Sequence, residues 1–360
     1  MKKNRNLIIT ILVFFLGAGF MYLLVNYSPA SVQTIVNKSE KEVTITDTGI
    51  ADSVEKLYDA VVVVGAYKDG VLASNGTGFV YDEDDKNAYI LTNSHVIDGA
   101  TSVKVKFTNE TIENVEVVGS DTYSDIAVLK IDKKKVLKIA EIDEVDELRV
   151  GDTVFAIGAP LDNEYSWTVT RGILSGKDRL VDVSTTTNQT ADWVMSVIQT
   201  DAAINSGNSG GPLANSNGEV IGITNMKLVS EGVEGIGFAI PISDAINYAS
   251  QLREKGKIER PFLGISMLDA TDTFNLSRYR IVLDANQTGA VVIDTQDGSP
   301  ASDAGLKMGD VIVKLEDYEI TSVARLKYYL YKYAPGDKVK ISYIRDGKTK
   351  TTELKLVKSE

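Results

Sequence analysis

The chain contains a single histidine, His95, which lies in the run TNSHV at residues 92–96. A serine among glycines, Ser209, lies far downstream in the run GNSGGP at residues 207–212. A serine hydroxyl becomes an effective nucleophile only when a neighbouring base accepts its proton. If this chain uses imidazole for acid–base chemistry, His95 must be the base, and Ser209 is then the best candidate nucleophile.

The glycines around Ser209 fit acyl-transfer chemistry. Glycine permits the tight turn with positive φ that points several N–H groups into one small space. Such groups stabilise the oxyanion that forms when a carbonyl is attacked. We therefore expect the N–H groups of Gly207, Asn208 and Ser209 to form an oxyanion hole. The alternative is an ordinary Gly-Asn-Ser surface turn, but the following Gly-Gly-Pro-Leu is more specific than a loop requires.

His95 follows an apolar run that is typical of a core strand. Burying a polar cluster at the end of such a strand costs free energy unless its groups are hydrogen-bonded or take part in function. The alternative is a purely structural histidine. An imidazole base needs a carboxylate that orients it, and Asp125, which opens the apolar run at residues 126–129, is the best candidate. Asp98 and Asp121 are the runners-up, but both lie in turn-like contexts where a capping role would explain them.

The order His, Asp, Ser differs from that of the α/β-hydrolases and of the subtilisins, and it is typical of the chymotrypsin-like double β-barrel. From Ala60 to Ala239 the chain consists of short β-rich runs separated by turn residues, as in all-β barrels. The fold class expected for this region is therefore an all-β double barrel. With one histidine and no cysteine, we expect no metal site and no cofactor.

These motifs resemble those of the HtrA-type (DegP/DegS-like) serine proteases, and the resemblance covers about residues 48–355. It implies an ATP-independent serine endopeptidase that acts on unfolded, misfolded or damaged exported proteins, as a homotrimer joined through its protease domains. It leaves open a regulatory protease that cuts one membrane protein, or a chaperone or peptide-sensing scaffold. Ser206 stands where the family usually has proline. The matching stretches are residues 76–79, 92–96, 124–129, 170–173, 199–213 and 235–241.

The residue six positions before Ser209 is Ala203. Trypsin-type enzymes that select Lys or Arg have a carboxylate at that position. The facing wall of the substrate pocket is expected to be formed by Ile236, Gly237 and Phe238. This apolar set predicts cleavage after small or medium aliphatic residues such as Val, Ala or Ile.

Composition and length limit the possible binding partners, cross-links and number of domains. The formal net charge of −12 and a pI near 4.8 argue against nucleic acid as a partner. The absence of cysteine excludes a disulfide framework. A length of 360 residues is enough for two domains and a tail.

The N-terminus predicts a membrane anchor. Residues 1–6 are basic, and the uncharged run at residues 7–25 can just span a bilayer as a helix. Basic residues favour the inner side, which places the catalytic domain outside a bacterial cell membrane with residues 26–47 as a linker. The alternative is a cleaved signal peptide, although residues 28–31 form a poor cleavage site.

The protease domain is expected at residues 48–245 and a connecting helix at residues 246–259, with Gly256 as a plausible stop. Residues 260–357 resemble a PDZ domain. In that family the segment that corresponds to Phe262, Leu263, Gly264 and Ile265 binds the carboxylate of a peptide C-terminus, and the peptide adds a strand to the sheet edge. The alternative is a small α/β domain without a ligand.

Overall fold

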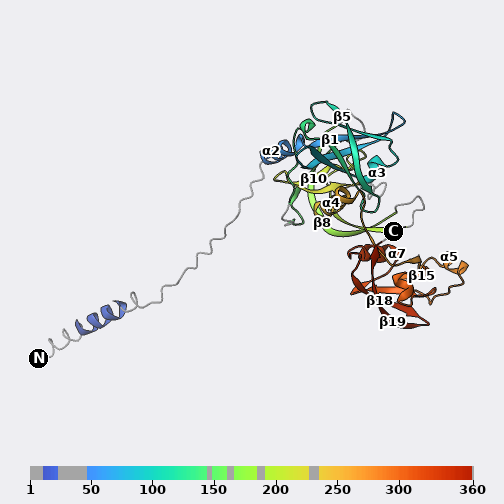
Figure 1. Cartoon of the computed structure of the whole chain (residues 1–360). Coiled ribbons are helices and arrows are strands. Elements are labelled where there is room, and N and C mark those ends of the chain that lie inside the picture. Colours follow the sequence, from blue (N-terminus) through green and yellow to red (C-terminus); the bar gives the residue numbers. More distant parts are fainter. Residues whose placement is uncertain are drawn as a thin grey trace. The chain divides into compact units, whose positions relative to one another are not determined.

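The computed structural model describes residues 11–22, 47–143, 148–159, 166–184, 191–226 and 235–358, and the chain divides into two compact units, Met1–Thr44 and Ile45–Glu360. In the first unit residues 11–22 are helical (Figure 1). Within the described part of the chain, no helix combines the length and the apolar character needed to cross a membrane. Residues 7–10 and 23–25 of the expected anchor lie outside the described residues, as do residues 1–6 and 26–46.

The second unit begins with helix α2 (Asp47–Tyr58), which buries Leu57. Every buried core residue of the described part lies in this second unit. A chain that starts near Val43 therefore keeps the whole of that core.

Six antiparallel strands form the first closed barrel, in the order β1-β2-β3-β6-β5-β4. Its interior is filled by aliphatic and aromatic residues, because the strands are rich in β-branched side chains that alternate inward. The strands are β1 (Val61–Lys68), β2 (Val71–Glu83), β3 (Asn87–Thr92), β4 (Ser102–Lys106), β5 (Ile112–Asp121) and β6 (Ile126–Asp132). Two short helices, α3 (Ser94–Ile97) and η1 (Lys133–Lys135), follow β3 and β6.

A second closed barrel has the order β10-β11-β12-β9-β8-β7. Together the two barrels confirm the double-barrel fold that the order of the candidate residues predicts. The strands are β7 (Thr153–Gly158), β8 (Thr168–Val183), β9 (Trp193–Thr200), β10 (Pro212–Asn215), β11 (Val220–Thr224) and β12 (Gly237–Pro241).

Helix α4 (Ile242–Lys255) follows the second barrel and buries Ile242, Ala245, Ala249 and Leu252. Their spacing of three and four residues lines one face of a helix, and this face joins the same core as residues of both barrels. Gly256 ends the helix with φ of 69°, a conformation that glycine adopts without a Cβ penalty. The connecting helix thus begins four residues before the expected segment 246–259 and ends at the expected stop, Gly256.

The C-terminal domain has its own hydrophobic core. Its main sheet has the order β14-β15-β16-β18-β19, with β17 paired to β16, and a small second sheet pairs β13 with β20. The strands are β13 (Pro261–Phe262), β14 (Ile265–Asp269), β15 (Ala290–Thr295), β16 (Val311–Leu315), β17 (Tyr318–Glu319), β18 (Lys338–Arg345), β19 (Lys348–Lys355) and β20 (Val357–Lys358). The helices are α5 (Thr273–Arg278), α6 (Pro300–Asp303) and α7 (Val323–Leu330).

Candidate active site

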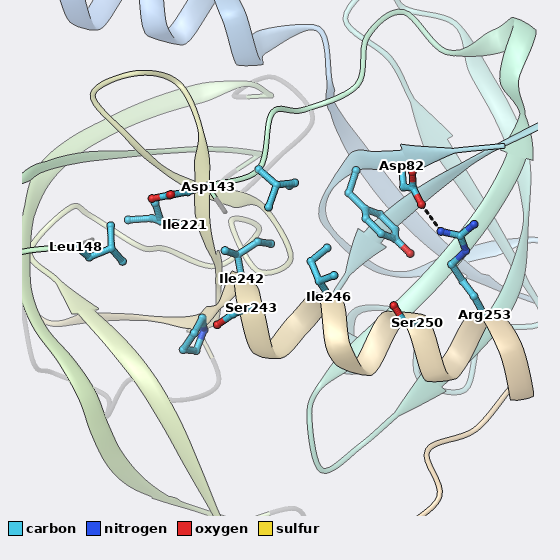
Figure 2. A pocket seen from close by; sticks show the side chains of 12 residues that line it. Asp82, Asp143, Leu148, Ile221, Ile242, Ser243, Ile246, Ser250 and Arg253 are labelled. Atoms are coloured by element: carbon cyan, nitrogen blue, oxygen red, sulfur yellow. Dashed lines mark hydrogen bonds and ion pairs between the residues drawn. The ribbon is translucent and has the colours of Figure 1, made fainter. Parts of the chain in front are cut away.

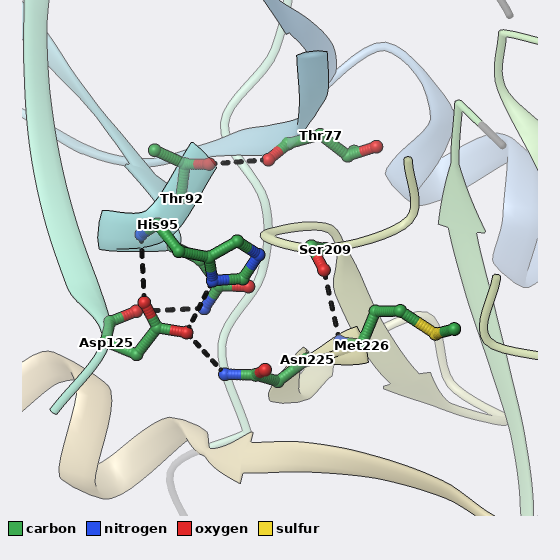
Figure 3. A network of polar contacts seen from close by, with 8 residues as sticks. Thr77, Thr92, His95, Asp125, Ser209, Asn225 and Met226 are labelled. Carbon is green, nitrogen blue, oxygen red and sulfur yellow. Dashed lines mark hydrogen bonds and ion pairs between the residues drawn. The ribbon is translucent and has the colours of Figure 1, made fainter. Parts of the chain in front are cut away.

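The three candidate residues come from both barrels and meet between them (Figure 3). His95 lies in α3, just after β3, and Asp125 lies just before β6. Because β3 pairs with β6 so that Thr92 faces Ala127, the two side chains come together. Ser209 lies in the turn before β10 of the second barrel, and its carbonyl accepts a 2.9 Å hydrogen bond from Thr77 N of the first barrel.

Asp125 holds His95 with both carboxylate oxygens. Oδ2 lies 2.7 Å from Nδ1 of the imidazole, and Oδ1 accepts a 3.0 Å hydrogen bond from the His95 backbone N–H. The Asp125 side chain is 4% exposed, whereas that of His95 is 29% exposed. A carboxylate at Nδ1 favours the tautomer in which Nδ1 carries the proton, which leaves Nε2 free to accept one.

Two asparagines complete the surroundings of Asp125. Asn225 Nδ2 donates to Asp125 Oδ2 at 2.7 Å, and Asn93 Nδ2 donates to the Asp125 carbonyl at 2.9 Å. The backbone of Asp125 has φ of 54°, which is unfavourable for a residue other than glycine and is held only when neighbouring contacts fix it. Asn93 belongs to the polar cluster around His95 in the sequence, but Asn225 lies 100 residues from Asp125 and no sequence signal marks it.

The runner-up carboxylates have other roles. Asp98 caps the C-terminal end of α3 and is exposed. Asp121 accepts hydrogen bonds from the backbone N–H and hydroxyl of Ser124, both at 2.7 Å. It also pairs in bidentate fashion with Arg260, at 2.6 and 2.7 Å. Of the three carboxylates considered, only Asp125 contacts His95.

The Arg260–Asp121 pair connects the start of the C-terminal domain to the first barrel. Asp121 in turn holds Ser124, the residue before Asp125. Burial alone would raise the pKa of Asp121, but Arg260 and the two Ser124 hydrogen bonds hold that pKa below its ordinary value. Aromatic rings pack beside this pair, with Trp193 of the second barrel 5.3 Å from Tyr331 and 5.2 Å from Tyr123, between ring centroids. Neither the pair nor this aromatic cluster was expected from the sequence.

The Ser209 hydroxyl is turned away from His95. Ser209 Oγ accepts a 3.1 Å hydrogen bond from Met226 N–H (Figure 3), and within the described residues it makes no hydrogen bond to His95. Proton transfer from Ser209 to His95 therefore requires the hydroxyl to turn toward His95 first. The turn itself is tightly fixed, because a Cβ on Gly210 would lie 2.2 Å from Thr77 O.

The turn offers two of the three expected oxyanion donors. Asn208 N–H donates to Asn205 O at 3.0 Å, so this donor is already engaged. The N–H groups of Gly207 and Ser209 have no partner among the residues that the structure describes. Gly207 has φ of 96°, and its carbonyl accepts a 2.7 Å hydrogen bond from Thr77 Oγ1, which fixes the orientation of the peptide that follows.

The expected substrate pocket is only partly assembled. A Cβ on Gly237 would lie 2.7 Å from Ile204 Cγ1, so Ile204, which was not expected from the sequence, packs directly against Gly237. Ala203 and Ile236 are exposed, and Phe238 packs partly against the barrel core. The pocket walls assigned here are therefore apolar.

The segment Phe262–Ile265 connects β13 to β14. A Cβ on Gly264 would lie 2.1 Å from Ser299 Cβ, and Gly264 has φ of 76°, so the loop requires glycine there. The carbonyls of Leu263 and Gly264 accept hydrogen bonds from Ala301 N and Gln296 N, at 3.0 and 2.9 Å, whereas the N–H groups of Leu263 and Gly264 donate to no described residue. Because β14 is an end strand of its sheet, an extended peptide can pair with it.

Comparisons with known proteins agree with this architecture. The trypsin-like peptidase domain family matches residues 76–223, and the PDZ domain family matches residues 261–356. The chain is 39% identical to serine protease Do-like HtrB of Bacillus subtilis (strain 168), over 95% of this chain and 81% of that protein.

It is 44% identical to serine protease Do-like HtrA of the same organism, over 80% of this chain and 64% of that protein. The crystal structure of the serine endoprotease from Yersinia pestis superposes with a TM-score of 0.65 at 30% identity, over 86% of this chain and 98% of that one.

Proposed function

Because this chain belongs to the HtrA-type serine proteases with a PDZ domain and is a serine endopeptidase, we propose that Ser209, His95 and Asp125 are its catalytic triad. The observation that carries the proposal is the Asp125 carboxylate on His95 Nδ1. It leaves Nε2 as a base on the side of the imidazole that faces Ser209 of the second barrel (Figure 3).

In this mechanism His95 Nε2 accepts the Ser209 proton while Oγ attacks the scissile carbonyl. The N–H groups of Gly207 and Ser209 stabilise the oxyanion, and Asp125 stabilises the imidazolium. His95 then protonates the leaving amine, and water hydrolyses the acyl-enzyme by the same steps in reverse. Since Asn208 N–H is engaged by Asn205 O, we assign it no share of the oxyanion hole in this conformation.

The apolar walls at Ile204, Ile236 and Gly237 support cleavage after small or medium aliphatic residues, such as Val, Ala or Ile. Ala203 leaves the pocket without the carboxylate that would select Lys or Arg. Discrimination by an apolar pocket is modest, about 1–3 kcal/mol per methylene. The preference should therefore be broad, which suits a protease that degrades unfolded or damaged proteins.

The PDZ domain is proposed to bind peptide C-termini and to regulate the protease. The N–H groups of Leu263 and Gly264, which donate to no described residue, support carboxylate capture, and the end strand β14 supports pairing with an extended peptide. The Arg260–Asp121 pair supports coupling, because Asp121 also holds Ser124, the residue before Asp125. Coupling of ordinary allosteric size would be about 1–3 kcal/mol.

The Ser209–Met226 hydrogen bond favours a second candidate function, a switched regulatory protease that cuts a specific membrane protein. In the conformation described, the hydroxyl is hydrogen-bonded to Met226 N–H and must turn toward His95 before reaction. A peptide at the PDZ domain that promotes this turn would activate the enzyme.

The protease is proposed to work outside the cell membrane of a bacterium, in quality control of exported proteins. Residues 7–25 would anchor it, with residues 1–6 in the cytoplasm and residues 26–47 as linker. Two relatives, from Hahella chejuensis and Pseudomonas savastanoi, are described as probable periplasmic serine endoproteases, which supports an extracytoplasmic location. The proposed assembly is a homotrimer, on the family resemblance. The proposed domains are residues 48–245 for the protease and 260–357 for the PDZ domain.

The test is digestion of unfolded casein by a chain that starts near Val43, wild type beside Ser209→Ala. The wild type should produce fragments that end mainly in Val, Ala or Ile, and the variant should produce none. A fragment map dominated by Lys and Arg ends would refute the assigned pocket. Fragments from Ser209→Ala at a rate within tenfold of wild type would refute the assigned nucleophile.

A further inference from the structure

A cavity of about 450 Å³ lies between helix α4 and the two barrels (Figure 2). It shares no residue with the candidate triad, oxyanion turn or substrate pocket. Its volume is within the range of small-molecule sites, about 300–1,000 Å³. The middle of the cavity is aliphatic, with side chains from the second barrel, the segment between the barrels and α4, and these are Ile142, Leu148, Ile221, Ile242 and Ile246.

One buried polar group at this cavity, the Tyr81 hydroxyl, has no hydrogen-bond partner among the described residues. Tyr81 lines the cavity and is 8% exposed, and its hydroxyl makes no hydrogen bond within the described part of the chain. Arg253 interacts with the phenol oxygen and offsets part of the effect of burial on the Tyr81 pKa, but a guanidinium can only donate, so the O–H proton has no acceptor among the described residues. Burial raises the pKa of Tyr81 to about 12, so the phenol stays protonated and remains a donor. Buried hydroxyls are normally hydrogen-bonded, so this O–H is suited to an acceptor that the protein does not supply.

The charges at this end of the cavity already neutralise each other. Arg253 Nη1 forms an ion pair with Asp82 Oδ2, and its guanidinium lies 3.7 Å from the centre of the Tyr89 ring. Asp143, which also lines the cavity, has an interaction of its own. An added carboxylate would compete with Asp82 for Arg253, and an added ammonium would compete with Arg253 for Asp82, so either charge would disturb a pair that is already formed. A neutral acceptor avoids both costs.

We propose that this cavity binds an unbranched aliphatic compound with one neutral hydrogen-bond acceptor, such as a fatty amide or ester. The acceptor would receive the Tyr81 O–H, and the chain would lie along α4 over Ile246 and Ile242 toward Leu148. From Ile242 to Ser250, which both line the cavity, the helix rises about 12 Å, close to the length of an extended nine-carbon amide. Nothing in this proposal depends on proteolysis or on peptide binding at the PDZ domain.

The test uses three probes of equal length, namely nonanamide, nonanoate and nonylamine. Each is titrated by calorimetry into the chain from Val43 onward, which keeps every buried core residue of the described part, with cooperative thermal unfolding as the check of its fold. Nonanamide should bind at least tenfold more tightly than either charged probe. Nonanoate or nonylamine binding as tightly as nonanamide would overturn the requirement for a neutral acceptor, and no binding of nonanamide would overturn the site.

Tyr81→Phe removes only the hydroxyl and should weaken nonanamide binding about threefold to tenfold. Its melting temperature should stay unchanged or rise, because an unpaired buried polar group is lost. Tyr248→Phe is the matched control, since Tyr248 is another largely buried tyrosine with a pKa raised to about 12, on α4 but outside this cavity. Its affinity should equal that of wild type.

Ile246→Trp should fill the cavity and abolish binding. If it unfolds, Tyr81→Phe still decides the matter. Unchanged affinity in Tyr81→Phe, or equal loss in Tyr248→Phe, would overturn the assignment of Tyr81 as the donor. A crystal structure grown with nonanamide that shows only water beside Tyr81 would overturn the ligand class.

Discussion

Asn225→Ala removes one of the donors that hold the Asp125 carboxylate. Asn225 is fully buried, and its Nδ2 donates at 2.7 Å to Oδ2, the same oxygen that faces His95 Nδ1. The substitution leaves both His95 contacts with Asp125 in place. The carboxylate should therefore keep its partner but lose part of its orientation, which makes Asn225 a positioning residue.

The size of the effect follows from the kind of hydrogen bond. Hydrogen bonds to charged groups contribute about 1.5–3 kcal/mol, which corresponds to about a 10- to 150-fold fall in kcat/KM. This is well below the loss of about 10⁴-fold expected when the carboxylate itself is replaced in Asp125→Asn. Because Asn225 positions the base and does not bind substrate, kcat should fall while KM stays nearly constant.

The assay is steady-state cleavage of a peptide with Val at the scissile position, from pH 5 to pH 9. The matched control is Asn215→Ala, which removes a 2.8 Å amide–carboxylate hydrogen bond to Glu219 in the same barrel. This control should keep wild-type kcat. If Asn225→Ala keeps a kcat within twofold of wild type, the positioning role is refuted. It is also refuted if Asn215→Ala shows the same loss of kcat and the same pH profile.

Three further predictions concern the domains. Arg260→Met should lower the melting temperature at neutral pH. The difference in melting temperature from wild type should shrink as pH falls through the folded-state pKa of Asp121, which is below its ordinary value. The reason is that a protonated Asp121 no longer forms an ion pair with Arg260. A constant difference in melting temperature, measured by calorimetry from pH 7 to pH 3, would contradict this. Protease added to intact cells should release a soluble fragment by cutting between residues 26 and 47, whereas a native chain found free in the medium with its N-terminus near Ser31 would favour a cleaved signal peptide. The isolated PDZ domain should bind peptides with a free C-terminus at least tenfold more tightly than amidated ones, and equal binding of both would remove carboxylate capture at Phe262–Ile265.

The sequence was sufficient for the barrels and for the position of His95, Asp125 and Ser209 within them. These features depend on local patterns, such as alternating apolar strands, a polar cluster at a strand end and glycines around a serine. The end of α4 at Gly256 was also predictable, since a glycine after a periodic helix is a strong local stop signal.

The rest depends on contacts between distant segments. Asn225 reaches Asp125 only because the two barrels meet, and Arg260 reaches Asp121 only because the C-terminal domain follows α4 back toward the first barrel. The engaged Asn208 N–H and the Ser209–Met226 hydrogen bond depend on single backbone and side-chain orientations, which residue types do not encode. Ile204 was missed because its packing against Gly237 is a contact between two segments that are far apart in the sequence.

The central claim is that Ser209 is a nucleophile activated by His95, and labelling with a serine-reactive fluorophosphonate tests it most directly. Intact-mass and peptide mass spectrometry should show one adduct per wild-type chain, on Ser209, and none on Ser209→Ala. His95→Ala should be labelled at least about 10³-fold more slowly, since no second histidine can replace the base. Labelling of another serine, or of His95→Ala at nearly the wild-type rate, would contradict the proposed triad.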